Sequence, residues 1–421
     1  MILVKSPRSD AGVRRTVFEN GLTVVSEHMP GVRSVAFGAW VRASSIHESR
    51  DRMGVSHMLE HMVFKGTSRR SAREIALSLE TLGGSLDAYT SREHTVYQAR
   101  VLDEHLTEAT DVIADLLFRP ALRPTDLALE RKVILEEISM VDDTPDDLVF
   151  EIHNAELWGE HPYGYSILGT RETVSSLGTR ELLALHERAY TPPQIVVAAS
   201  GSIDHDDLIA MLRSTGWDAI APGDQTAMTS SAPDVVPPHR KHIEREGAQT
   251  HVVYGSRAIP HGDERRYALG LVSTLLGGGM SSRLFQRVRE DLGLAYAIST
   301  FQSLHVDTGV HGVYVATGPD TAADAMGVIE AELTDVATNG LPDAEIESGK
   351  QQLRGQITLS MESVSSRMYR AASPELYGEP FRSLDEVLDR VQGITLDEVR
   401  AVCAEFFAPE GQTVVSLGPD K

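Results

Sequence analysis

A stretch of sequence near residue 180 recurs near residue 397, and this internal repeat constrains the fold more than any other feature. Six residues of the first copy match six of the second at a constant offset of 217. The matched positions are Leu177, Glu181, Leu182, Tyr190, Pro192 and Gly201, paired with Ile394, Glu398, Val399, Phe407, Pro409 and Gly418. In both copies an amphipathic helix leads to an aromatic-x-Pro turn and a β-branched run. The repeat predicts a duplicated α+β domain; the alternative is two unrelated domains that both end in helix, turn and strand.

The segment 221–238 is the predicted boundary between the two copies. Its sequence, APGDQTAMTSSAPDVVPP, is rich in Pro, Ser, Thr and Ala and has no hydrophobic period, as is typical of a linker. The chain of 421 residues accommodates two domains of roughly 100–200 residues each. We therefore expect a catalytic domain over 1–220, a linker over 221–238 and a homologous domain over 239–421.

Charge and composition exclude several classes of protein. Lys and Arg total 39 against 61 Asp and Glu, a net charge of −22, whereas a surface that follows a phosphate backbone is basic. No apolar run approaches the ~20 residues of a membrane span, and the first residues are too polar for a secretory signal. The one cysteine, Cys403, excludes a disulfide framework and a cysteine-based zinc finger. We expect a cytoplasmic protein that neither binds nucleic acid nor spans a membrane.

The local patterns of the first half predict strands and helices in alternation. Residues 16–25 read as a hairpin with Asn20-Gly21 at its tip. The further predicted elements are strands at 34–41 and 85–102 and helices at 54–63, 71–82, 103–117 and 124–141.

The predicted helix at 54–63 contains the motif His57-Met58-Leu59-Glu60-His61. His57 and His61 are four residues apart, so both imidazoles lie on one face of a helix, and Glu60 shares that side. Neutral imidazoles are good zinc ligands, and a free carboxylate beside a zinc-bound water can accept its proton. The alternative is a solvated helix face on which Glu60 forms an ion pair.

A catalytic zinc site needs a third ligand from another element. The predicted helix at 124–141 offers Glu130, Glu136 and Glu137. Glu130 and Glu137 are seven residues apart and share one face, whereas Glu136 points about 100° away. Periodicity alone also allows a solvated acidic stripe.

The motif and the residues that follow it, Met62 to Thr67, resemble the inverzincin signature of the pitrilysin/insulinase group of zinc peptidases. The closest resemblance is to the β subunits of mitochondrial processing peptidases and their bacterial relatives. In that family the third ligand is a glutamate 76 residues after the second histidine, which corresponds to Glu137. A family glutamate that supports the site corresponds to Glu130. The resemblance therefore implies Zn²⁺ held by His57, His61 and Glu137.

The same resemblance implies where peptides bind. The stretch 83–95 is similar to the strand at the edge of the family's active site, which pairs with substrate backbone; Asp87 replaces the usual Asn, and Ala88 follows it. In the second half, 276–285 and 289–296 are similar to the family's C-terminal domain. An Arg and a Tyr there reach the substrate and the developing oxyanion, and they correspond to Arg289 and Tyr296. Taken alone, Gly277-Gly278-Gly279 predicts only a flexible turn.

The family fold implies two homologous α+β domains, each a mainly antiparallel sheet covered by helices, which form a clamshell around a peptide cavity. The expected activity is a zinc-dependent endopeptidase that hydrolyses unfolded or processing peptides, with Glu60 as general base and Glu130 in a supporting role. The resemblance also implies a dimer, either of identical chains or with an inactive partner subunit, because relatives of this length commonly act as dimers. Two alternatives are a non-catalytic core or scaffold subunit and a zinc-storage or zinc-sensing protein. Both are disfavoured, because no motif residue is missing and storage needs no free base.

Overall fold

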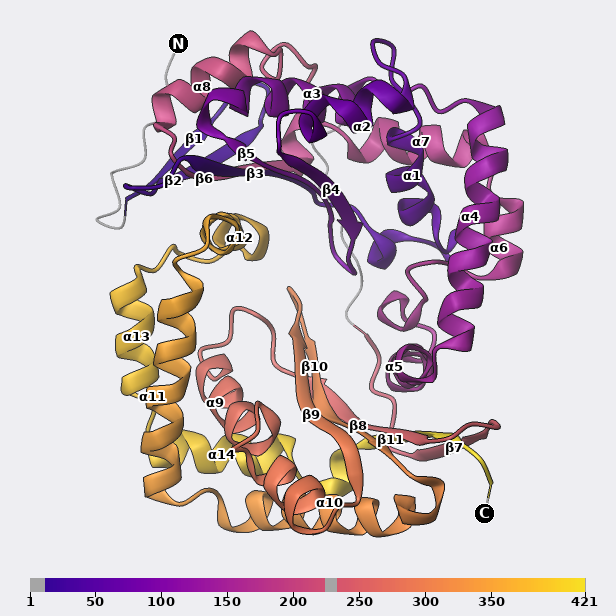
Figure 1. Ribbon diagram of the computed structural model, residues 1–421, viewed down its shortest axis with the longest axis vertical. Coiled ribbons are helices and arrows are strands. Elements are labelled where there is room, and N and C mark those ends of the chain that lie inside the picture. The colour runs from indigo at the N-terminus through magenta and orange to yellow at the C-terminus, as the bar shows by residue number, and fades with distance from the viewer. Residues whose placement is uncertain (1–11, 224–232, 421) are drawn as a thin grey trace. The chain divides into compact units, whose positions relative to one another are not determined.

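The computed structural model describes residues 12–223 and 233–420, which form two compact units (Figure 1). Unit 1 comprises Met1–Ser139, Tyr165–Ser231 and Leu359–Ser383. Unit 2 comprises Met140–Gly164, Ala232–Thr358 and Leu384–Lys421. Each unit is built on one sheet, and each sheet has an apolar cluster on both of its faces.

The sheet of unit 1 has six strands in the order β1-β2-β6-β3-β5-β4. Its strands are β1 (Val13–Val17), β2 (Thr23–His28), β3 (Ser34–Val41), β4 (Ser85–Thr90), β5 (Thr95–Leu102) and β6 (Ile195–Gly201). All neighbours are antiparallel except β2 and β6, which are parallel. Strand β4 lies at one edge, so one side of its backbone has no partner strand among the described residues.

Alternation along the strands gives this sheet two apolar faces. Phe37 and Tyr97 belong to the larger cluster, while Trp40 and Val96 belong to the smaller cluster on the opposite face. Helices that contribute to the larger cluster are α1 (Val55–Val63), α2 (Ala72–Glu80), α3 (Leu106–Phe118), α4 (Pro124–Asp143), α6 (Arg171–Ser176), α7 (Thr179–Ala189) and α8 (His205–Ser214). The other face is covered by α12 (Val364–Tyr377) (Figure 1).

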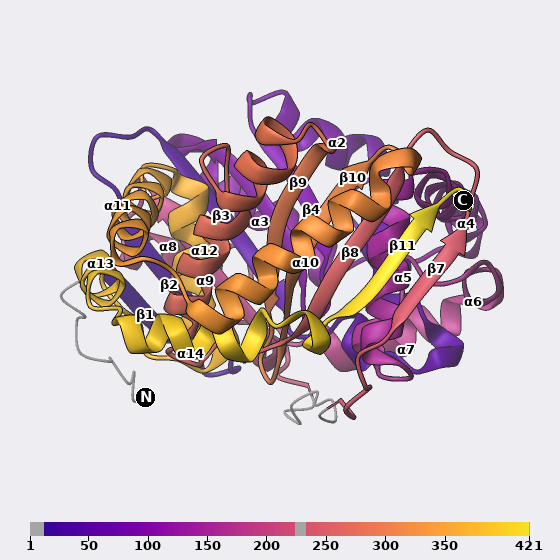
Figure 2. The same cartoon turned by 90° about the horizontal axis from the view of Figure 1, so that it is seen from below.

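The sheet of unit 2 has five strands in the order β7-β11-β8-β10-β9. Its strands are β7 (Arg240–Glu244), β8 (Thr250–Ala258), β9 (Ala295–Leu304), β10 (Gly309–Thr317) and β11 (Thr413–Gly418). Its helices are α5 (Pro145–Trp158), α9 (Arg266–Gly277), α10 (Ala322–Asn339), α11 (Asp343–Ser360), α13 (Leu384–Gln392) and α14 (Leu396–Phe406). Figure 2 shows α10 lying across this sheet, and α14 packs against α9, α10 and β8. The opposite face is covered by α5.

The two sheets confirm the internal repeat. Strand β6 is parallel to β2 and antiparallel to β3, and β11 is parallel to β7 and antiparallel to β8. The repeated helix, turn and strand are α7 with β6 and α14 with β11. The sheet of unit 1 differs from the sheet of unit 2 by one additional strand, β1, at its edge. The expected fold class, two homologous and mainly antiparallel α+β domains covered by helices, is therefore confirmed.

The compact units differ from the contiguous domains expected over 1–220 and 239–421. Helix α5 precedes the predicted linker but packs on β8 and β11 of unit 2. Helix α12 follows the linker but packs on β2, β3 and β6 of unit 1. The reason is that each helix buries its apolar side against the sheet of the other half, a pairing that local sequence does not encode. Of the predicted linker, residues 224–232 lie outside the described part of the chain.

The predicted local elements of the first half agree with the structure, with one difference. The hairpin forms as β1 and β2, with Gly21 at φ +91° in its turn. The stretch 85–102, expected to be strand-like throughout, is two antiparallel strands, β4 and β5, joined by a turn over 91–94. This turn is closed by the N–H of Ser91, which donates to the His94 carbonyl oxygen.

Candidate metal centre

Helix α1 carries the His-x-x-Glu-His motif and is held at both its buried side and its N-terminus. Met58, Leu59 and Met62 are fully buried in the large cluster of unit 1, so His57, Glu60 and His61 occupy the remaining face. Before the helix, Gly54 adopts φ +89°, and a Cβ there would lie 2.6 Å from the Leu168 carbonyl oxygen. The motif is thus presented from a helix whose position is closely constrained.

A buried carboxylate caps the start of α1. The N–H groups of Gly54 and Ser56 donate to the two oxygens of Glu48, at 2.7 and 2.8 Å. Burial raises the pKa of Glu48 to about 7, although these two hydrogen bonds oppose the shift. Negative charge at a helix N-terminus also interacts favourably with the helix dipole. Glu48 therefore fixes the backbone immediately before His57.

Three side chains converge on one point beside α1. The Nε2 atoms of His57 and His61 lie 3.7 and 3.6 Å from the two carboxylate oxygens of Glu137 on α4. One ligand atom from each residue lies within 4.8 Å of the others, and among the described residues this is the group of three such side chains that could hold a metal ion. The predicted alternative, Glu136, is exposed on the same helix.

The polar atoms of this cluster fit a metal ion. Oε2 of Glu137, which faces Nε2 of His57, is buried and has no hydrogen-bond partner among the described residues. Burial, with a smaller contribution from His61, lowers the pKa of His57 to about 3, so its imidazole is neutral at neutral pH. Two imidazoles and a carboxylate are a ligand set that suits Zn²⁺.

Glu130 lies on the same side of α4 as Glu137, as the seven-residue spacing predicts, and it contacts His61. Its Oε2 is 3.1 Å from Nδ1 of His61, and its Oε1 is 2.7 Å from Nζ of Lys65. A carboxylate only accepts hydrogen bonds, so Nδ1 carries the proton and Nε2 remains available as a ligand atom. Lys65 was not singled out from the sequence, although it lies four residues after His61.

Glu60 lies next to the cluster but contacts a different element. The Thr90 hydroxyl at the end of β4 donates to Oε2 of Glu60 at 2.5 Å. Burial raises the pKa of Glu60; the Thr90 hydrogen bond opposes this rise, while Glu137 and Asp87 add to it. Thr90 was missed by sequence reasoning, because only the alternation of β4 indicates that it faces α1.

The predicted peptide-binding strand is at an open sheet edge. Asp87 and Ala88 lie in β4, and Oδ1 of Asp87 accepts the N–H of Ala88 at 2.9 Å. An edge strand offers unpaired backbone groups to an extended peptide. A peptide that accepts a hydrogen bond from the N–H of Ala88 has to share this N–H with Oδ1 of Asp87 or displace that oxygen.

Arg289 and Tyr296 belong to unit 2, whereas the metal cluster belongs to unit 1. Arg289 lies in a π-helical stretch, Phe285–Asp291, and its guanidinium carbon is 5.1 Å from the centre of the Tyr296 ring. Tyr296 is 75% exposed at the start of the edge strand β9. The seven-residue spacing thus brings these two side chains together.

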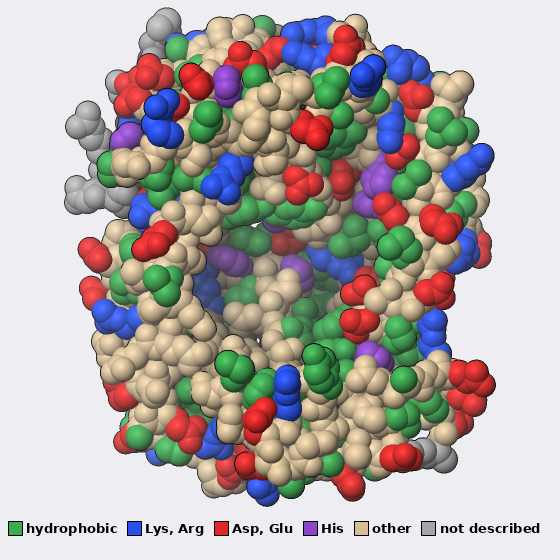
Figure 3. Space-filling view, in the orientation of Figure 1, with side chains coloured by type: hydrophobic (Ala, Val, Ile, Leu, Met, Phe, Trp, Pro, Cys, Tyr) green, Lys and Arg blue, Asp and Glu red, His purple; other side chains and the backbone are tan. Residues whose placement is uncertain are grey.

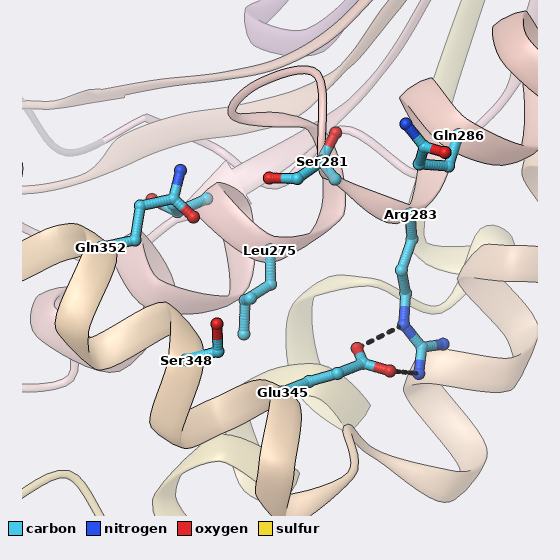
Figure 4. A pocket seen from close by; sticks show the side chains of 9 residues that line it. Leu275, Ser281, Arg283, Gln286, Glu345, Ser348 and Gln352 are labelled. Atoms are coloured by element: carbon cyan, nitrogen blue, oxygen red, sulfur yellow. Dashed lines mark hydrogen bonds and ion pairs between the residues drawn. The ribbon is translucent and has the colours of Figure 1, made fainter.

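Packing explains Gly277, the last residue of α9 and the first of the glycine-rich turn. A Cβ at Gly277 would lie 2.6 Å from the Thr300 backbone nitrogen on β9. Beside the turn is a cavity of about 360 Å³, where Arg283 forms an ion pair with Glu345 at 2.8 Å (Figure 4). Arg283 also contacts Asp335 at 3.2 Å, so its charge is compensated. The turn is structural, and its arginine does not provide a free cation for a phosphate.

Surface charge on the visible face is mixed. Figure 3 shows Lys and Arg side chains lying among Asp and Glu side chains. Among the described residues, Arg69 and Arg70 both form ion pairs with Asp111, at 2.7 and 2.5 Å. Within the described residues, no helix combines the length and apolar character needed to cross a membrane.

The fold and this cluster define a protein of two homologous α+β domains with a candidate zinc centre on the first. The chain belongs to the M16 peptidase family. The family model described as Insulinase (Peptidase family M16) matches residues 23–171. A second, described as Peptidase M16 inactive domain, matches residues 176–353.

Similar proteins cover nearly the whole chain. An uncharacterized zinc protease of Mycobacterium leprae is 39% identical over 417 residues, covering 99% of this chain and 93% of the relative. An uncharacterized zinc protease of Bacillus subtilis is 37% identical over 400 residues, which cover 94% of this chain and 96% of the relative. A protease structure from Helicobacter pylori has a TM-score of 0.92 at 20% identity, covering 97% of this chain and all 100% of that chain. A Pseudomonas fluorescens structure titled as a peptidase M16 inactive domain has a TM-score of 0.91 at 20% identity, covering 97% and 98%. These two structures show the fold alone, whereas the family and the named relatives support a zinc peptidase.

Proposed function

We propose that this protein is a zinc-dependent endopeptidase that hydrolyses unfolded or processing peptides. His57, His61 and Glu137 would hold the Zn²⁺ ion, and Glu60 would act as the general base. One observation carries the proposal: two Nε2 atoms and the Glu137 carboxylate converge beside Glu60, while Oε2 of Glu137 is buried without a hydrogen-bond partner among the described residues.

The mechanism divides between the ion and the side chains of this chain. When bound, Zn²⁺ supplies Lewis-acid chemistry that polarises a carbonyl and acidifies water. Glu60 is held at Oε2 by Thr90, so Oε1 remains to accept a proton from water and to deliver it to the leaving amine. Burial raises the pKa of Glu60, which strengthens it as a proton acceptor. Glu130 orients His61, as its 3.1 Å contact with Nδ1 indicates.

Substrate binding belongs to the same proposal. A peptide would add to the open edge of β4 at Asp87 and Ala88, where backbone hydrogen bonds give affinity without strict sequence preference. Arg289 and Tyr296 would contact the substrate and stabilise the oxyanion; this assignment rests on the family resemblance and on their 5.1 Å contact with each other.

We also propose that the protein works in the cytoplasm as a dimer, of identical chains or with a related subunit. The single cysteine, Cys403, is buried and free, which suits a reducing compartment. Sedimentation of the purified protein, alone and from a lysate of its source, tests the dimer. A chain that sediments as a monomer in both would contradict it.

The deciding experiment compares the wild type with Glu60→Gln. Cleavage of a library of unfolded peptides and the zinc content are measured on both proteins. We expect about one zinc per chain in each, activity in the wild type, and a loss of at least about 100-fold in the variant, because general base catalysis contributes roughly 10²–10⁴-fold. Zinc without cleavage in the wild type would favour the alternative, a non-catalytic scaffold subunit. The absence of zinc from both would overturn the metal centre.

A further inference from the structure

The hydroxyl of Thr90 connects the proposed peptide-binding strand to the proposed base. Thr90 is the last residue of β4, and its Oγ1 donates to Oε2 of Glu60 at 2.5 Å. Glu60 lies on α1, and only 9% of its surface is exposed. The contact therefore joins a strand and a helix at the catalytic carboxylate.

The alternation of β4 explains why Thr90 points toward α1. Leu86 and Ala88 pack against the large cluster that contains α1, whereas Tyr89 packs against the cluster on the opposite face. Side chains two residues apart share a face of a strand, so Thr90 follows Ala88. Backbone pairing with Thr95 on β5 then fixes its position.

A fixed hydroxyl limits the conformations of Glu60. A glutamate side chain rotates about three bonds, and no other hydrogen bond to its carboxylate is present in the part of the chain that the structure describes. Hydrogen bonds to an ionised group are roughly twice as strong as neutral ones. The bond therefore selects one orientation, in which Oε2 is occupied and Oε1 is available.

We propose that Thr90 is a positioning residue, whose hydroxyl holds Glu60 in the orientation required for proton transfer. The proposal rests on the proposed peptidase function. Because Thr90 ends the strand on which a peptide would add, an ordered β4 also orders the base. Thr90 acts through Glu60 and makes no contact with the candidate zinc ligands among the contacts described.

The test compares Thr90→Val with Thr90→Ser. Valine keeps the shape and the β-branch but removes the hydroxyl, whereas serine keeps the hydroxyl. We expect Thr90→Val to lower kcat by roughly 10- to 100-fold, the loss of one hydrogen bond to a charged group, with KM and zinc content unchanged. Thr90→Ser should stay within about threefold of the wild type, since the hydrogen bond persists.

Thr95→Val provides the matched control. Thr95 pairs with Thr90 across the hairpin, but its hydroxyl donates to the Ala43 carbonyl oxygen at 3.3 Å and not to Glu60. Its kcat should equal that of the wild type. Thermal unfolding of all three variants shows whether each is folded.

The double variant Thr90→Val with Glu60→Gln distinguishes a role in positioning Glu60 from a general effect on the structure of the site. If Thr90 acts through the carboxylate, Thr90→Val should cause no further loss of kcat in a Glu60→Gln background. Additive losses, equal damage by serine and valine, or a wild-type kcat for Thr90→Val would each overturn the assignment. A fully active Glu60→Gln, or a wild type without activity, would instead overturn the proposed function and this inference with it.

Discussion

The carboxylate of Glu130 is shared between two positively polarised partners, although it is not itself a candidate zinc ligand. One oxygen accepts from Nδ1 of His61 and the other contacts the ammonium group of Lys65, at 3.1 and 2.7 Å. Only 5% of Glu130 is exposed, so water hardly competes for these contacts. Oε2 thus fixes the tautomer and the ring orientation of His61, while the contact of Oε1 with Lys65 holds the carboxylate in place.

Glu130→Gln should therefore weaken zinc binding. The amide keeps a single acceptor, so either His61 or Lys65 faces an NH₂ group instead of an oxygen. We expect the dissociation constant for zinc to rise by about 10- to 100-fold, measured by competition with a chelator. Glu136→Gln is the matched control, because this residue is exposed on the same helix. Equal affinities for the two variants would show that Glu130 does not support the site.

At this scale, spacing along helices could be predicted and contacts between elements could not. The four-residue spacing of His57 and His61 and the seven-residue spacing of Glu130 and Glu137 each follow from the helical period, and all four side chains lie at the cluster. The choice of Glu137 over Glu136 needed the family resemblance. Thr90 had no such signal, since its contact depends on how far β4 lies from α1.

At the scale of elements, the N-terminus of α1 depends on the ionisation of Glu48. Burial raises the pKa of Glu48 from an ordinary 4.5 to about 7 in the folded chain. The folded state therefore binds more protons than the unfolded state between these values, so the free energy of unfolding falls as the pH rises through this window. Below pH 4.5 both states are protonated, and above pH 7 both are ionised.

Glu48→Gln should remove this pH dependence. Relative to the variant, the wild type should lose up to about 3 kcal/mol of stability between pH 4.5 and 7 and nothing further above pH 7. Urea unfolding of both proteins at several pH values measures the difference. If the difference in unfolding free energy between the two proteins stays constant across the window, Glu48 is ionised throughout. If the wild type becomes relatively more stable as the pH rises, folding lowers the pKa of Glu48 instead of raising it.

The local elements of the first half could be predicted because each has its own signals. The Asn20-Gly21 turn sets the first hairpin, and Ser71 caps α2 by accepting the N–H of Glu74. The stretch 85–102 shows the limit: residues 90–95 are all polar and interrupt the apolar pattern at the turn, but the strand-like residues on either side led to one continuous prediction over what are β4 and β5. Here hydrogen bonds of the turn, and not hydrophobicity, determine where the strands end.

At the scale of the whole molecule, the two halves exchange a helix. Adding the repeat offset of 217 to the bounds of α5 gives residues 362–375, which overlap α12. The exchanged helices are thus equivalent positions of the duplicated domain. The repeat itself was visible in the sequence, but the partner of each helix was not, because an apolar face carries no information about which sheet it covers.

This exchange makes α12 necessary for unit 1. Met368 and Val364 on the helix cover Trp40, Val96 and other side chains of the sheet. Arg367 forms an ion pair with the buried Glu27 at 2.6 Å. Burying one large apolar side chain contributes roughly 1.5–3 kcal/mol, so several of them make up much of the ~5–15 kcal/mol that stabilises a typical domain.

A chain of residues 1–223 alone should therefore aggregate or bind a hydrophobic dye, and it should fail to bind zinc. Co-expression of residues 233–421 as a separate chain should restore solubility, co-purification and zinc, because it supplies α12 and receives α5. Fusing 359–383 to residues 1–223 through a flexible linker isolates the contribution of α12 and should restore zinc binding without the second unit. Size-exclusion chromatography and metal analysis distinguish these products. If residues 1–223 alone are monomeric and bind zinc, the sheet of unit 1 and the helices on its larger cluster are sufficient for folding. The face that α12 covers would then be stable without this helix.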